Sequence, residues 1–132
     1  MQVYECKKIE MKRDMDLIRE LLLHIEENPI FDGTRWMQPH SSEDLGITDR
    51  SFKEVAYHLN LLVEEGLVRG TFGMEAPQIS RLTSKGHDFL DDTRDPGIWK
   101  KTKERLKGLP SVGIAIIGEI AKAEIKKHLG LA

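Results

Sequence analysis

The chain has 132 residues, of which 39% are apolar and 32% charged, and its 20 basic and 22 acidic side chains leave a net charge of −2. This length is typical of one domain that buries about two-thirds of its unfolded surface. The composition excludes a disordered tail or a collagen-like fibre. No apolar run approaches the roughly 18 residues of a membrane-spanning helix, and no signal peptide is visible. The single cysteine, Cys6, cannot form an internal disulfide. We therefore expect a cytoplasmic protein without membrane contacts.

The first predicted helix begins near Asp14, an N-capping residue that is followed by Asp16 in the first turn. It ends at Asn28 because the residue before a proline avoids the helical region. Its apolar positions recur at helical spacing: Met15, Ile18, Leu21, Leu22 and Ile25. One side of this helix is therefore expected to face the core.

Residues 30–47 are rich in Gly, Pro, Ser and Asp. A short strand is predicted at Arg35–Met37, and one or two helical turns at Ser41–Gly46. Because Pro39 precedes these turns and Gly46 interrupts them, the supporting helix at this position is expected to be short or distorted.

A stronger helix follows, capped either by Thr48 or by Ser51 together with Glu54. Gly66 supplies the stop. Its apolar stripe contains Phe52, Val55, Leu59, Leu62 and Val63. Leu67–Phe72 and Gln78–Leu82 then predict a β-hairpin that is closed by Gly73–Pro77.

Three further helices are predicted, starting at Thr83 or Ser84 and ending near Arg94, from Ile98 to Lys107, and from Ser111 to Leu129. Residues 97–132 carry 8 basic and 3 acidic side chains, whereas residues 1–96 carry 12 and 19. The last helix is apolar over more than half of its circumference in its first part. It either packs across the first helix or forms a two-fold contact in a homodimer.

The order of elements, helix, short strand, helical turns, strong helix and hairpin, is that of a winged helix-turn-helix. The segment Val55–Val68, which ends in Glu65-Gly66-Leu67-Val68, resembles the end of the second motif helix in many bacterial winged-helix regulators. The segment Leu82–Leu90 resembles the step from the wing into a further helix. The predicted fold class is therefore mainly α with a small β-hairpin (α+β): an N-terminal extension at 1–10, a winged-helix domain at 11–95, and C-terminal helices at 96–132.

Three segments narrow the resemblance: Met11–Arg19, His58–Leu62 and Gly86–Asp91. Together they resemble a family of small phage- and prophage-associated proteins of unknown function. The resemblance supplies no activity. It implies a winged-helix body, a bacterial or phage origin and a role in gene regulation.

The resemblance to winged-helix regulators predicts contacts with double-stranded DNA. Four side chains on the strong helix are expected in the major groove: Arg50, Lys53, Tyr57 and His58. Arg69 and Arg81 are expected on phosphates beside the wing. Cations of the basic helix add an auxiliary clamp: Lys100, Lys101 and Lys103.

Other side chains favour an alternative function. Glu54, Glu64 and Glu65 repel phosphate along the same helix, and Leu61 is better suited to a protein surface. The alternative is an interaction module whose Tyr57 and Leu61 bind another protein without DNA.

Catalysis, cofactors and metals find no support in the sequence. The five histidines form no i,i+4 pair, and the chain contains neither H-E-x-x-H nor C-x-x-C. We therefore expect no enzyme. Trp36 and Trp99 are both expected in the core, with Trp99 anchoring the basic helix on the winged body; the alternative is a platform on which bases stack.

Overall fold

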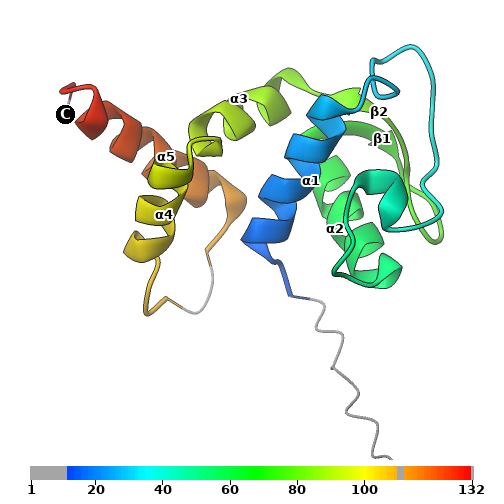
Figure 1. The fold of residues 1–132 in the computed structure, drawn as a ribbon, viewed down its shortest axis with the longest axis horizontal. Coiled ribbons are helices and arrows are strands. Elements are labelled where there is room, and N and C mark those ends of the chain that lie inside the picture. The colour runs from blue at the N-terminus through cyan, green and yellow to red at the C-terminus, as the bar shows by residue number, and fades with distance from the viewer. Residues whose placement is uncertain (1–11, 110–111, 132) are drawn as a thin grey trace, which may run out of the picture. The chain divides into compact units, whose positions relative to one another are not determined.

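The structure, a computed structural model, describes residues 12–109 and 112–131. It divides into two compact units, one ending at Thr83 and the other beginning at Ser84 (the N-terminal and C-terminal units; Figure 1). The sequence places a domain boundary later, after residue 95, whereas the structure groups the helix that follows the hairpin with the C-terminal helices. Within the described ranges, no helix is both long and apolar enough to cross a membrane.

The first helix, α1 (Met15–Glu27), begins and ends as predicted. The carboxylate of Asp14 accepts a hydrogen bond from the backbone N–H of Leu17 and caps the helix. Asn28 has extended backbone angles before Pro29, and the helix stops there. Its buried face consists of Leu17, Ile18, Leu21, Leu22 and Ile25. This face packs against the second long helix and the sheet.

The segment after α1 contains a 3₁₀ turn, η1 (Glu43–Leu45), and then α2 (Phe52–Glu64). The turn confirms the prediction that a helix here is short. Ser51 caps α2 by accepting a hydrogen bond from the N–H of Glu54, so the cap is Ser51 and not Thr48. The buried residues of α2 are Val55, Ala56, His58, Leu59 and Leu62.

The predicted hairpin is present as β1 (Val68–Thr71) and β2 (Gln78–Leu82), paired antiparallel with an irregularity between Arg69 and Gly70. The strand expected at 35–37 is reduced to one bridge between Met37 and Ile79, with both N–H to oxygen distances at 2.9 Å. The N–H of Gly33 also donates to the carbonyl of Ser80. Segment 33–37 therefore lies along the edge of β2 that β1 does not occupy.

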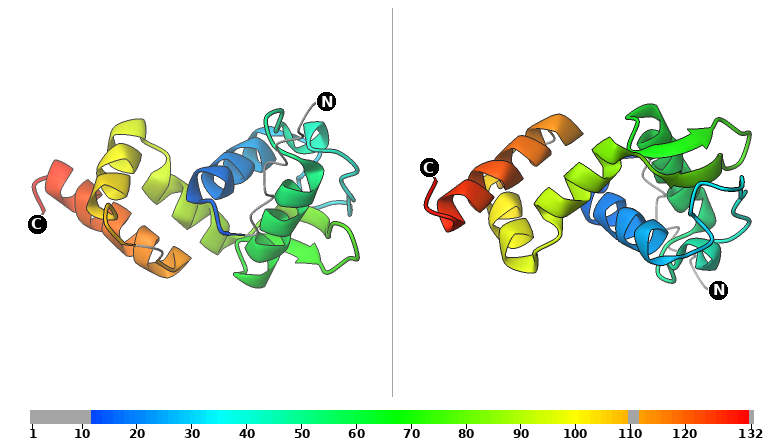
Figure 2. Two further views of the ribbon diagram at one scale, coloured as in Figure 1. Left: turned by 90° about the horizontal axis from the view of Figure 1, so that it is seen from below. Right: turned by 90° about the horizontal axis from the view of Figure 1, so that it is seen from above.

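The C-terminal unit contains α3 (Ser84–Thr93), α4 (Pro96–Arg105) and α5 (Ile114–His128). Asp95 caps α4 by accepting from the N–H of Ile98, and α5 packs against both α3 and α4. The buried carboxylate of Glu124 on α5 lies 3.2 Å from the guanidinium of Arg105 on α4. The chain is thus mainly helical with a small two-stranded antiparallel sheet (Figure 2).

The position of η1 depends on a close approach to α1. Gly46, which ends η1, has a φ of +75°, and a Cβ atom there would lie 2.5 Å from Nδ1 of His24. Gly66, which follows α2, has a similar φ of +74° but has open space where its Cβ would lie. The two glycines therefore share a backbone conformation and differ in their surroundings.

We expect G46A to destabilise the protein more than G66A does. The left-handed backbone costs each variant about 1–2 kcal/mol, and the overlap with His24 adds about 1–3 kcal/mol to G46A alone. Urea unfolding of both variants measures the difference. Equal losses would contradict the packing of η1 on α1.

Candidate nucleic-acid interface

Arg50 precedes α2, and its charge is compensated within the N-terminal unit. Its guanidinium lies 2.5 Å from the carboxylate of Asp14 and 3.6 Å from that of Glu54. Its backbone carbonyl also accepts a hydrogen bond from the hydroxyl of Ser42. Arg50 therefore ties the start of α2 to the cap of α1, and a phosphate would have to compete with two carboxylates for it.

The same ion pair acts on Asp14. Burial alone raises the pKa of the Asp14 carboxyl, but the hydrogen bonds from Arg50 and from the N–H of Leu17, with the charge of Arg50, bring that pKa below its ordinary value of 3.8. The ionised carboxylate is thus the form that the folded protein favours.

His58 is buried, so the prediction that it reads DNA from an exposed face is wrong. Only 1% of its surface is exposed. Its Nε2 accepts a hydrogen bond of 2.8 Å from the backbone N–H of Asp14, and its Nδ1 lies 2.8 Å from the carbonyl oxygen of Glu54. This pattern requires a neutral ring whose Nδ1 donates. The spacing carried the signal: position 58 follows Val55 by three residues and precedes Leu62 by four, inside the buried stripe.

Three of the side chains that the sequence places on the outward side of α2 are at least partly exposed. Lys53 is exposed, while Tyr57 and Leu61 are half-buried. These positions are four residues apart and share one side of the helix. Glu64 and Glu65 lie exposed at the end of α2. The outer face of α2 therefore presents one lysine, two partly covered apolar side chains and two carboxylates.

The β1–β2 hairpin, which the sequence predicts to be a wing, places Arg69 opposite Arg81. They are directly paired across β1 and β2 and are both exposed. The guanidinium carbon of Arg69 lies 5.5 Å from the centroid of the Trp36 ring. The stem of Arg81 passes over Gly33, and its guanidinium donates to the carbonyl of Leu82. Within the described ranges, neither arginine has an ion-pair partner.

Trp36 is not a core residue. It is 45% exposed. Met37 forms the single bridge with β2, and because side chains alternate along an extended segment, the preceding residue, Trp36, faces outward. Its partner Arg69 lies far from it in the sequence, and sequence patterning did not connect the two. Arg69, Arg81 and Trp36 together are named the wing patch.

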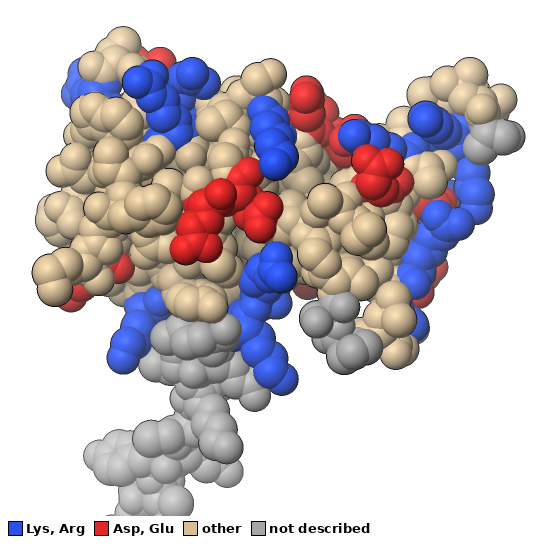
Figure 3. Space-filling view, turned by 180° about the vertical axis from the view of Figure 1, so that it is seen from behind, with Lys and Arg blue, Asp and Glu red and all other residues tan. Residues whose placement is uncertain are grey.

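The three lysines of the basic helix belong to the C-terminal unit. Lys100, Lys101 and Lys103 are exposed on α4, and the ammonium of Lys103 lies 5.8 Å from the centroid of the buried Trp99 ring. They form a basic strip of their own. Within each unit, Figure 3 shows basic and acidic groups side by side instead of one continuous basic face.

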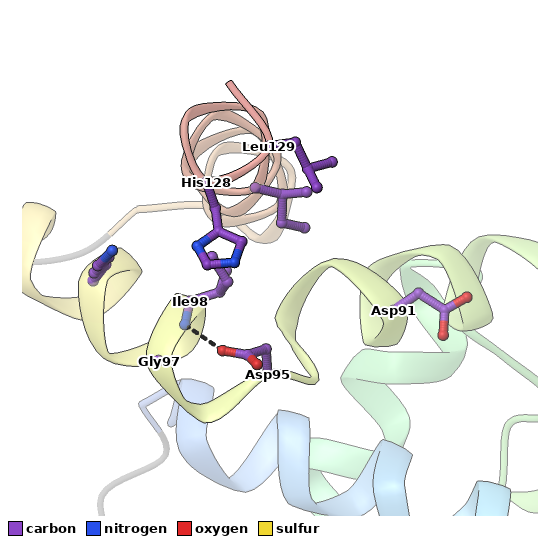
Figure 4. Close-up of a pocket in the computed structure, with 8 residues that line it drawn as sticks. Asp91, Asp95, Gly97, Ile98, His128 and Leu129 are labelled. Atoms are coloured by element: carbon purple, nitrogen blue, oxygen red, sulfur yellow. Dashed lines mark hydrogen bonds between the residues drawn. The ribbon is translucent and has the colours of Figure 1, made fainter. Parts of the chain in front are cut away.

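A cavity of about 370 Å³ also lies in the C-terminal unit (Figure 4). Its lining consists of Asp91, Asp95, Gly97, Ile98, Lys101, Ile125, His128 and Leu129. Both carboxylates already have partners: Asp91 lies 2.9 Å from the Arg94 guanidinium, and Asp95 caps α4. Among the residues that the structure describes, no group of three or more His, Cys, Asp or Glu is placed to hold a metal ion.

A family model described as "Hypothetical protein (DUF2513)" matches residues 12–113, from just before α1 to the N-cap of α5. The chain belongs to the DUF2513 family. It is also 29% identical over 124 residues to an uncharacterized protein of Haemophilus influenzae, a match that covers 90% of this chain and 99% of that protein. No solved structure matches significantly. Membership of a family of unknown function is thus confirmed, and the phage association stays a prediction.

The Asp14–Arg50 pair gives this DUF2513 protein a testable dependence on pH. A lowered pKa in the folded state stabilises the protein above the ordinary pKa of Asp, and this stabilisation is lost as the pH falls through the folded value. We expect D14N, which keeps a capping side chain, to lose about 1 kcal/mol at pH 7. The difference from the wild type should shrink near pH 3.

Urea unfolding at both pH values measures this difference. D91N is the matched control because Asp91 also pairs with an arginine, Arg94, but lies exposed on α3. We expect D91N to change stability by less than about 0.5 kcal/mol. Equal effects of D14N and D91N at pH 7 would show that the Asp14 pair has no special role.

Proposed function

We propose that residues 14–83 of this DUF2513 protein form a winged helix-turn-helix module that binds double-stranded DNA and regulates transcription in a bacterium or its phages. The order of elements supports this proposal: α1, the Met37 bridge, η1, α2 and then the β1–β2 hairpin. In this arrangement α2 is the recognition helix, the hairpin is the wing, and η1 replaces the usual supporting helix.

The observation that carries the proposal is the pairing of Arg69 with Arg81. Like charges directly opposite each other on a sheet are destabilising, and the described structure holds no carboxylate against either of them. A phosphate of the DNA backbone between the two guanidinium groups would relieve this repulsion with charge-assisted hydrogen bonds. The wing patch is therefore the principal phosphate contact of the proposed complex.

The helix α2 contributes fewer contacts than expected from the sequence. Lys53 is exposed near its start, where recognition helices meet base edges. Arg50 is paired with Asp14 and His58 is buried. We infer that phosphate contacts dominate the affinity, which then falls steeply with salt.

A second candidate is an interaction module that binds a protein partner. The half-buried Tyr57 and Leu61 favour it, because they lie next to each other on the outward side of α2 with Glu64 and Glu65 beyond them. Such a partner would present an apolar groove with basic groups at its edge. Charge separates the two candidates: DNA requires the wing arginines, whereas this partner requires Tyr57 and Leu61.

A homodimer would suit either candidate. Ile116 of α5 is exposed over 52% of its surface, and a two-fold contact around it would present two modules to adjacent half-sites. The lysines at 100, 101 and 103 would then serve as auxiliary phosphate contacts.

Fluorescence anisotropy with a random-sequence duplex tests the DNA proposal. We expect binding to weaken steeply between about 50 and 200 mM salt. We expect R69A/R81A to bind at least tenfold more weakly, with a reduced salt slope, because about two phosphate contacts are lost. The control is K126A/K127A, which removes the same charge from exposed positions on α5.

Each outcome assigns the contact. Equal losses in R69A/R81A and the control would mean general electrostatic attraction, and the wing would not be the site. A loss confined to K100A/K101A/K103A would move the contact to α4. No binding at the lowest salt would reject the DNA proposal, and a Y57A/L61A variant would then test the protein partner.

A further inference from the structure

The loop that joins β1 to β2 exposes two large apolar side chains. Phe72 is 69% exposed, and Met74 is as exposed as in an extended chain, at 105%. In both views of Figure 2, this loop projects at the outer edge of the N-terminal unit. We name residues 72–77 the wing tip. Large apolar side chains this exposed, two residues apart in one loop, are candidates for a binding surface.

The wing tip is held in shape by contacts within the unit. Ala76 and Pro77 are buried, and the side-chain amide of Gln38 donates a hydrogen bond of 3.3 Å to the carbonyl of Ala76. A Cβ atom at Gly73 would lie 2.3 Å from the same carbonyl oxygen. The tight turn at Gly73 and the buried Ala76 thus leave Phe72 and Met74 pointing away from the core.

The charges behind the wing tip indicate what covers it. Arg69 lies on β1, three residues before Phe72, and its cross-strand partner Arg81 lies on β2. Both arginines face solvent on the hairpin that carries the two apolar side chains. A partner that fits this surface has an apolar slot beside closely spaced negative charges. Stacked bases between two phosphate backbones have this chemistry.

We propose that the wing tip inserts Phe72 and Met74 into the minor groove of the bound duplex as a wedge that unstacks a base step and bends the DNA. This inference rests on the proposed DNA binding and adds the mode of contact. Phe and Met are among the side chains that proteins use in this way. Pyrimidine–purine steps unstack most easily, so the wedge favours sites that contain TA or CA/TG.

The contact between Trp36 and Arg69, beside the wing tip, argues against an anionic lipid surface as the partner. A lipid surface usually takes a free tryptophan at its interface, but the Trp36 ring already lies against Arg69. Glu75, next to Met74, is exposed and repels phosphate in either case.

We expect E75Q to bind DNA about two- to fivefold more tightly, as one like-charge contact is removed.

The test uses the full chain and a duplex with 2-aminopurine at a central TA step and fluorophores at both ends. We expect the wild type to raise the 2-aminopurine fluorescence and to shorten the end-to-end distance. We expect F72A/M74A to bind the same duplex within about tenfold of the wild-type affinity and to lose both signals, because the arginines keep the phosphate contacts. The control is L109A/L131A, which removes two exposed apolar side chains elsewhere.

Failure of the wedge and failure of DNA binding give different results. Wild type that binds the duplex without either signal, or F72A/M74A that keeps both, would overturn the wedge and leave DNA binding intact. Wild type that does not bind the duplex would overturn the proposed function, and the wedge with it. Sedimentation with phosphatidylcholine–phosphatidylglycerol vesicles is the last arm: binding that requires Phe72 and Met74, with duplex signals that do not, would assign the wing tip to lipid.

Discussion

The hydrogen bonds of the buried His58 determine how the N-terminal unit is assembled. Its ring accepts from the N–H of Asp14, the capping residue of α1, and faces the carbonyl of Glu54 one turn earlier on α2. One imidazole thus fixes the start of α1 against the middle of α2. The outward side of α2 is fixed with it. A charged imidazole would place two donors against each other, because its Nε2 would meet the N–H of Asp14. The neutral ring is therefore the form that this packing requires.

The His58 hydrogen bonds between α1 and α2 also determine which charged side chains are available to bind a partner. With α1 held at His58, the carboxylate of Asp14 lies within reach of Arg50. Arg50, which the sequence predicts to contact DNA, is consequently held in an ion pair within the N-terminal unit. Arg69 and Arg81 have no ion-pair partner in the described structure, and they lie instead on the hairpin, whose strand β2 is bridged to Met37 through Ile79.

Local chemistry made most of the elements predictable. The cap at Asp14, the stop at Gly66 and the hairpin turn at Gly73–Pro77 each follow from residues within a few positions of one another. The site was less predictable, because its decisive contacts join distant segments. Asp14 and Arg50 are separated by 36 residues. The contact of Arg69 with Trp36 depends on the single β-bridge between Met37 and Ile79. Periodicity reports which face is buried and carries no information about such pairs.

In the proposed complex with DNA, the distribution of charge also constrains how the N-terminal unit selects a site. Base edges are read by side chains on a recognition helix, and α2 offers Lys53 with few companions. Phosphate contacts at the wing position a duplex without reading it. If α2 reads few bases, sequence preference has to come from the energy needed to deform the duplex. An apolar wing tip next to paired arginines is a means of converting deformability into preference, so the reduced recognition face and the exposed Phe72 and Met74 are consistent with one mode of binding.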